Sequence, residues 1–168
     1  MKVTDEWNEY VSKYPVRGNW MLNELARIKR HPLCVYQFPE AVCDYVSAGI
    51  LHTARQRFKF LKATCGKVNG TNHVWLHDTD ADIYIDFTVG QFNSVGLDIM
   101  AGSKEDLEAA GYTFGSEDPC DDIIKSAEQQ YVNDIIKINK EKAKKGGMRC
   151  RQSRRRRTRR RRKELSAY

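Results

Sequence analysis

The sequence lacks a hydrophobic run long enough to span a membrane, and its first residues, Met1 to Glu6, lack the apolar stretch of a secretory signal. It also lacks a glycine-rich phosphate loop and the G-x-S-x-G and H-E-x-x-H motifs. Its five cysteines are an odd number at irregular spacing, with no Cys-x-x-Cys pair. We therefore expect no transmembrane segment, signal peptide, disulfide scaffold or zinc ribbon, and a chain that resides in a reducing compartment.

Charge is unevenly distributed along the 168 residues, which carry a formal net charge of +7. Residues 137–168 hold 16 basic and 2 acidic residues, whereas residues 1–136 hold 13 basic and 20 acidic ones. This segregation excludes a uniformly basic nucleic-acid-binding domain. With 40% hydrophobic residues the chain can still build a core. We expect an acidic body over residues 1–145 and a basic tail, disordered when free, over residues 146–168.

The basic tail has a density of arginine that a solvated surface does not need. We expect it to bind nucleic acid or another polyanion; an import signal, an acidic membrane surface and the acidic body are the alternatives. The tail has almost no aromatic residues before Tyr168, so base stacking is not expected. The candidate nucleic-acid-binding residues are Arg149, Arg151, Arg154, Arg155, Arg156, Arg157, Arg159, Arg160, Arg161, Arg162 and Lys163.

The hydrophobic pattern predicts an α+β body in which helices pack on a small antiparallel sheet. Ser103 and Asp106 form a capping-box pattern at the start of one short helix, which Gly111 ends, and Gly146–Gly147 is expected to end the last helix. The acidic run Asp78, Asp80, Asp82 lacks the glycine and glutamate of a calcium loop and is interpreted as a solvated turn. The expected helices cover residues 7–14, 19–31, a stretch that begins between 40 and 43 and ends at 62, 103–111 and 121–145; the expected strands cover 73–77 and 83–89.

Three residues form a candidate catalytic group: Cys43, His73 and Asp86. Cys43 begins a predicted helix, where free backbone N–H groups stabilise a thiolate. His73 and Asp86 lie on opposite strands of the predicted hairpin; if its turn is centred near Asp80, residue 73 faces residue 87. A thiolate can attack a carbonyl, an imidazole can transfer the proton, and a carboxylate can orient the imidazole. The alternatives are a buried structural thiol, a merely hydrogen-bonded histidine and a solvated carboxylate.

Three sequence blocks around these residues resemble those of papain-fold, transglutaminase-like cysteine proteins. They are CDYVS at 43–47, NHVWL at 72–76 and IDFTVGQF at 85–92, in the order Cys, His, Asp. The resemblance covers residues 37–92, about a third of the chain, and implies that fold. It also implies an oxyanion-stabilising role for Gln37, six residues before Cys43. Trp75 and Gln91 are candidates for the substrate cleft, with the protein core as their alternative.

The resemblance implies acyl chemistry on a protein or peptide substrate: peptide hydrolysis, glutamine deamidation or transglutaminase-like acyl transfer. It implies no cofactor. A short thiol enzyme with a basic tail is typical of a viral or effector protein, located in the cytoplasm or on nucleic acid, and in the nucleus of a eukaryotic host. The alternative hypothesis is a non-enzymatic protein with an enzyme-like body, which binds nucleic acid through its tail or inhibits another protein.

Overall fold

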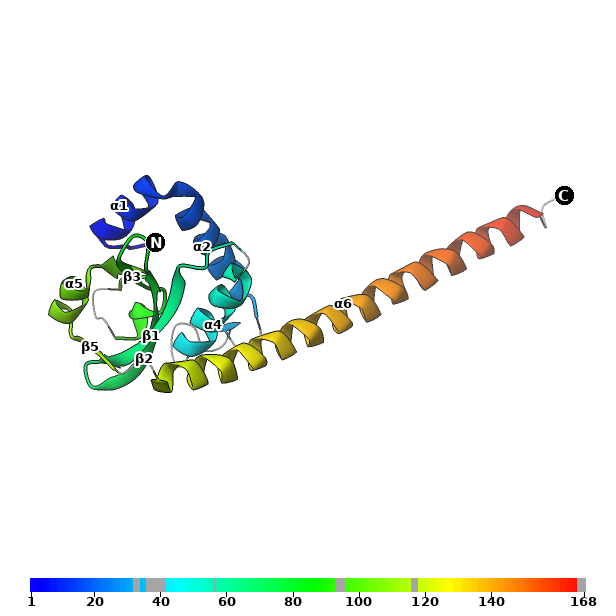
Figure 1. Ribbon diagram of the computed structural model, residues 1–168. Helices are drawn as coiled ribbons and strands as arrows, with labels where there is room; N and C mark the ends of the chain where they lie inside the picture. Colours follow the sequence, from blue (N-terminus) through cyan, green and yellow to red (C-terminus); the bar gives the residue numbers. More distant parts are fainter. Residues whose placement is uncertain (32–33, 36–41, 56, 93–95, 116–117, 166–168) are drawn as a thin grey trace. The chain divides into compact units, whose positions relative to one another are not determined.

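The structure, a computed structural model, confirms the α+β class and describes residues 1–31, 34–35, 42–55, 57–92, 96–115 and 118–165. The chain divides into two compact units, Met1–Tyr131 and Val132–Tyr168. The first unit holds the sheet and most of the helices (Figure 1). No helix in the described ranges is both long and apolar enough to cross a membrane.

Among its described residues, the first unit contains four complete α-helices and the beginning of a fifth. The second helix starts at Pro15, because proline has no N–H to leave unpaired at a first helical position. The expected capping box is confirmed: the Ser103 side chain accepts from the Asp106 N–H, and the Asp106 carboxylate accepts from the Ser103 N–H. The helices are α1 (Asp5–Lys13), α2 (Pro15–Ile28), α4 (Cys43–Ala54), α5 (Lys104–Ala109) and α6 (Asp118–Leu165).

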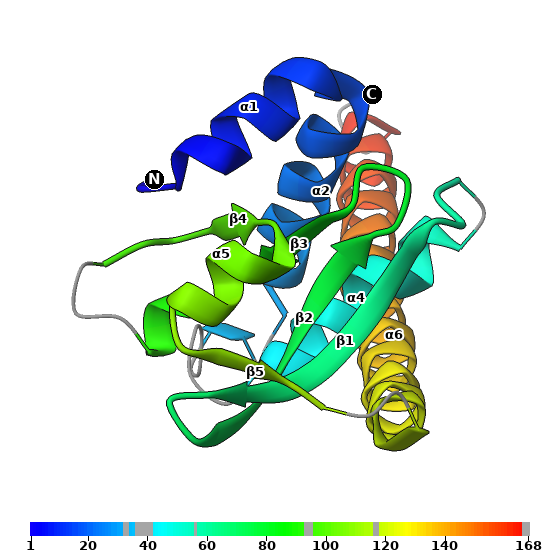
Figure 2. The same cartoon turned by 60° about the vertical axis from the view of Figure 1, so that its left-hand side comes forward.

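Five antiparallel strands form a single sheet in the order β4-β3-β2-β1-β5. Along β2, Val74 packs with Ala48 of α4, while its neighbour Trp75 packs with Leu107 of α5. Since successive side chains of a strand point to opposite faces, α4 and α5 cover opposite faces of the sheet (Figure 2). The strands are β1 (Leu61–Val68), β2 (Thr71–Asp78), β3 (Ile83–Asp86), β4 (Met100–Gly102) and β5 (Tyr112–Phe114).

The expectation of one helix that continues to residue 62 is wrong, because α4 ends at Ala54 and β1 begins at Leu61. Phe58 and Leu61 continue the helical spacing of apolar residues by coincidence. The β1–β2 hairpin turns at Asn69 and Gly70, which both have positive φ, at 50° and 83°. An Asn-Gly pair is the preferred two-residue hairpin turn, so this sequence signal marks β1 as a strand.

The interpretation of Asp78 as part of a solvated turn is also wrong. Asp78 is fully buried and accepts hydrogen bonds from the Tyr10 hydroxyl at 2.7 Å and the Arg17 guanidinium at 3.1 Å. The Arg17 guanidinium in turn lies over the Phe60 ring, 3.8 Å from its centre. A buried carboxylate is stable only when paired in this way, so Asp78 fastens α1 and α2 to the β2–β3 hairpin.

Helix α6 runs through Gly146–Gly147 to Leu165, beyond the expected end at the glycine pair. Each glycine costs about 1 kcal/mol of helix stability relative to alanine, but Arg, Lys, Gln and Met are strong helix formers. Residues of these types flank Gly146–Gly147, so the helix continues through the two glycines. The arginine-rich segment, expected to be disordered, is therefore helical up to Leu165 and belongs to the second unit.

Candidate active site

The three candidate catalytic residues lie on three different elements of the first unit. Cys43 is the first residue of α4, His73 lies in β2, and Asp86 is the last residue of β3. The β2–β3 hairpin pairs Leu76 with Ile85, which places its centre half a residue beyond Asp80. Continued along both strands, this register would set residue 73 opposite residue 88, one residue beyond the expected 87. The side chains of His73 and Asp86 nevertheless meet, with 2.7 Å between Nε2 and Oδ2.

Asp86 is almost completely buried and accepts four hydrogen bonds. Its Oδ2 accepts from His73 and, at 2.6 Å, from the Tyr112 hydroxyl of β5. Its Oδ1 accepts from Thr88, through the backbone N–H at 2.7 Å and the hydroxyl at 2.9 Å. Burial, and then the charge of Asp86, raise the pKa of Tyr112, so that its hydroxyl stays protonated as a donor. These donors hold the carboxylate in a fixed orientation.

The protonation state of His73 is set by its two acidic partners. Burial by itself lowers the pKa of His73, but hydrogen bonds to Asp86 and to Cys43, together with the charges of both, outweigh burial and raise the pKa to about 9. His73 is therefore an imidazolium at neutral pH. Because Nε2 faces Asp86, Nδ1 is the nitrogen available to other partners.

Gln91 lies beside His73, with its side-chain nitrogen 3.1 Å from Nδ1. The amide group carries donors at one end and an acceptor at the other. A half-turn of the amide therefore lets Gln91 donate to a neutral imidazole or accept from an imidazolium. The structure places Gln91 against the candidate catalytic histidine.

A cavity of about 700 Å³ lies at the start of α4. Cys43, which is half-buried, and His73 both line it, so the thiol and the imidazole face the same space. Trp75 is 1% exposed and packs against Tyr112 and Phe114. Trp75 therefore lies in the protein core and is not among the residues that line this cavity. The remaining lining residues are Asp44, Cys65, Gly66, Lys67, Asn72, Val74, Thr113, Phe114, Gly115 and Ile123.

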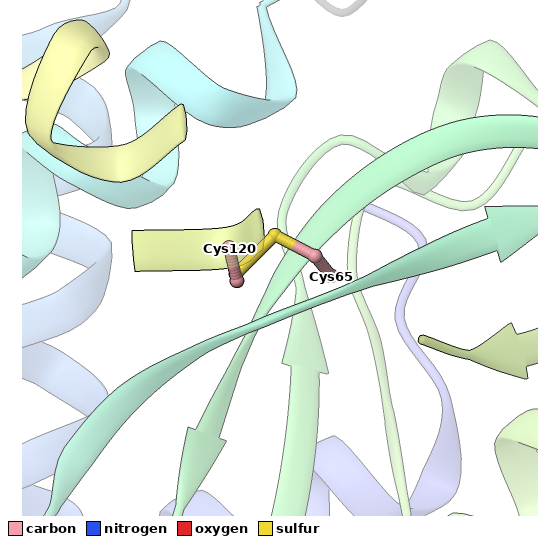
Figure 3. The surroundings of a disulfide bond; sticks show 2 residues. All are labelled: Cys65 and Cys120. Atoms are coloured by element: carbon pink, nitrogen blue, oxygen red, sulfur yellow. A yellow bond between two sulfur atoms is a disulfide. The ribbon is translucent and has the colours of Figure 1, made fainter. Parts of the chain in front are cut away.

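A disulfide joins Cys65 of β1 to Cys120 of α6, in a sequence whose cysteine spacing argued against a disulfide scaffold (Figure 3). The two residues are 55 positions apart in sequence, and no spacing motif marks them. Pairing follows from packing, since both sulfurs lie in the apolar cluster between α4, α6 and the sheet. Cys43 packs against the same cluster, and neither Cys43 nor the buried Cys34 forms a disulfide.

Several neighbours of the candidate catalytic residues were not found from the sequence. Tyr112 is 26 positions from Asp86 in sequence, and β1 and β2 lie between their strands in the sheet, so no local pattern indicates this contact. Thr88 could have been found, because an Asp-x-Thr sequence commonly forms a local side-chain-to-backbone turn. Gln37 lies outside the described residues. Among the residues described, no three His, Cys, Asp or Glu side chains are grouped to hold a metal ion.

No protein-family model, no curated protein and no solved structure matches this chain.

Proposed function

We propose that the chain is a cysteine-nucleophile enzyme that acts on an amide or acyl bond of a protein or peptide. The observation that carries the proposal is His73, which hydrogen-bonds the buried Asp86 on one side and interacts with Cys43 on the other, at the wall of a cavity. A thiol, a charged imidazole and an orienting carboxylate are the three groups that thiol acyl transfer needs. The papain-like, transglutaminase-like resemblance of the sequence supports the same chemistry.

The reaction follows from these positions. The Cys43 thiolate attacks the carbonyl carbon of the substrate, a C–S bond forms, and the carbonyl electron pair moves to oxygen. As the tetrahedral intermediate collapses, the C–N bond breaks and the His73 imidazolium gives its proton to the leaving nitrogen. Neutral His73 then accepts a proton from water, which hydrolyses the thioester, or from an amine, which takes over the acyl group. Asp86 keeps the imidazole oriented throughout.

Cysteine alkylation tests the proposed nucleophile directly. Each cysteine of the full chain is alkylated with iodoacetamide between pH 5 and 9, and the sites are quantified by peptide mass spectrometry. We expect Cys43 to react faster near pH 6 than the buried Cys34, and to lose this advantage in His73→Ala. If Cys43 reacts like an ordinary thiol of pKa about 8.5 in both proteins, the proposal is wrong.

Activity is tested by incubating the full chain with a mixed peptide library, with and without an added primary amine. Mass spectrometry distinguishes cleaved, deamidated and amine-linked products, and therefore hydrolysis, deamidation and transfer. Cys43→Ala should abolish every product, whereas Cys150→Ala, which removes a thiol of the second unit, should abolish none. Equal products from wild type and Cys43→Ala would favour the non-enzymatic alternative.

We further propose that the arginine-rich segment binds nucleic acid through phosphate contacts and so localises the enzyme. Its support is the run of eight arginines between Arg154 and Arg162. If about eight phosphates are neutralised, the logarithm of the binding constant falls with the logarithm of salt concentration with a slope near −7. Replacing Arg154 to Arg157 by glutamine should reduce this slope by about half and leave Cys43 alkylation unchanged. An unaltered slope would contradict this role.

A further inference from the structure

Three polar side chains form a row across adjacent strands at the cavity. The pairing sets Asn72 of β2 opposite Lys67 of β1, and Lys67 opposite Thr113 of β5. Directly opposite residues of antiparallel strands place their side chains on the same face of the sheet. All three residues line the cavity that contains Cys43 and His73. We call Asn72, Lys67 and Thr113 the polar row.

The polar row lies a short, definable distance from the candidate nucleophile. Cys65 and Val74 are the next pair on the same face of these two strands, two residues along from Lys67 and Asn72. Val74 belongs to the apolar cluster against which both Cys65 and Cys43 pack. Two residues of an antiparallel strand rise about 7 Å. A group bound at the polar row is therefore about two extended peptide residues from the bond that Cys43 would attack.

The chemistry of the polar row fits a carboxylate. Lys67 supplies a positive charge, and the Asn72 amide supplies neutral hydrogen-bond donors. The Thr113 hydroxyl donates to the Lys67 carbonyl oxygen at 3.4 Å and so ties β5 to β1 beside these two residues. Lys67 is exposed, and in the part of the chain that the structure describes no carboxylate forms an ion pair with it. The acidic residue of the cavity, Asp44, accepts the backbone N–H of Tyr45 at 2.8 Å.

The cavity also has apolar lining residues. Ile123 of α6, 42% exposed, and Val74 of β2 both line it. They can contact the aliphatic stem of a substrate whose charged end reaches Lys67. The positive charge of Lys67 attracts a substrate carboxylate, and the apolar residues contact the stem that carries it. A neutral amide of the same shape lacks the charge interaction, so the site selects for an acidic side chain or a peptide C-terminus.

We propose that the polar row is a subsite for a substrate carboxylate about two residues from the attacked carbonyl, so that the enzyme prefers acidic peptides. The proposal rests on the function proposed above and names its substrate class. An Asp or Glu side chain and a free peptide C-terminus carry the same carboxylate. The test distinguishes these two sources.

The test uses three thiol-reactive peptides with the full-length protein: chloroacetyl-Gly-Glu-amide, chloroacetyl-Gly-Gln-amide and chloroacetyl-Gly-Gln with a free carboxyl terminus. The rate of Cys43 modification is measured for each by peptide mass spectrometry. Neutral iodoacetamide measures the reactivity of the thiol itself. The variants are Lys67→Gln and, as a matched control, Lys62→Gln, which removes an exposed lysine of the same strand outside the cavity.

We expect at least one carboxylate peptide to modify Cys43 two- to fivefold faster than the neutral peptide, as an exposed charge pair allows. Lys67→Gln should bring this ratio to about one, and Lys62→Gln should keep it. The faster of the two carboxylate peptides identifies the source of the carboxylate. A wild-type ratio of one, a ratio that survives Lys67→Gln, or one that Lys62→Gln also removes would overturn the subsite. Slow alkylation of Cys43 by iodoacetamide would show separately that Cys43 is not an activated nucleophile.

Discussion

The Cys65–Cys120 disulfide should contribute a large part of the stability of the first unit. It closes a loop of 55 residues that contains β2, β3, β4, α5 and β5. A cross-link of this length restricts the unfolded chain, and the chain-entropy model gives about 4 kcal/mol at 25 °C. A domain of ordinary stability has about 5–15 kcal/mol in total. Reduction should therefore remove about a quarter or more of the free energy of unfolding.

The measurement is urea unfolding of the wild type with and without a phosphine reductant, followed by tryptophan fluorescence, to which the buried Trp7 and Trp75 contribute. With a denaturant dependence of about 2 kcal/mol per molar urea, the midpoint should fall by about 2 M on reduction. The double variant Cys65→Ala/Cys120→Ala is the control. It should unfold near the midpoint of the reduced wild type and should not respond to reductant.

The same experiment also tests whether the disulfide affects the candidate active site. Cys120 holds the first turn of α6, which brings Ile123 to the cavity, whereas His73 and Asp86 are held by β2 and β3. Below the unfolding transition, reduction should leave the iodoacetamide reactivity of Cys43 within about twofold. A wild-type midpoint that does not change with reductant would refute the stabilising role of this disulfide.

Three further predictions concern the residues around the imidazole. The pKa of His73 is raised from 6.5 to about 9, so its interactions contribute stability that is complete below pH 6.5 and is lost as the pH rises through 9. The difference in urea midpoint between wild type and His73→Gln should therefore shrink over this range, and a difference that stays constant would contradict the raised pKa. Tyr112→Phe removes a donor to the buried Asp86 carboxylate and should cost about 1.5–3 kcal/mol in urea unfolding; a loss below about 0.5 kcal/mol would refute the contact. Gly66→Ala should destabilise by about 1–3 kcal/mol, because its Cβ would lie 2.0 Å from the Thr113 carbonyl oxygen; an unchanged thermal midpoint would show that β5 yields without cost.

Local sequence patterns predicted the parts of the fold that local interactions determine. The capping box at Ser103 and Asp106 is formed within four residues, so its spacing alone was informative. The start of a helix at Cys43 and the β2–β3 hairpin were also predicted. In contrast, the apolar spacing of α4 continues into β1, and only the Asn69–Gly70 turn marks the change from helix to hairpin.

The less predictable features all depend on contacts between distant residues. Asp78 is buried because Tyr10 and Arg17, more than sixty residues away, donate hydrogen bonds to it. Tyr112 reaches Asp86 because β5 and β3 belong to the same curved sheet, which no local pattern specifies. The disulfide likewise joins two cysteines without a spacing motif. Residue types suggested the candidate catalytic group, but its supporting donors required the fold.

The interaction of His73 with Asp86 is unlike what stability alone would favour at a buried position. Removing two charges from water costs several kcal/mol per ion, and well-packed apolar residues often stabilise such a position as well or better. In this chain both groups are nearly inaccessible, and Tyr112 and Thr88 supply further donors to the carboxylate. The imidazole side that faces away from Asp86 borders a cavity with a free thiol. A charge pair beside a cavity and a free thiol therefore supports the proposed proton transfer.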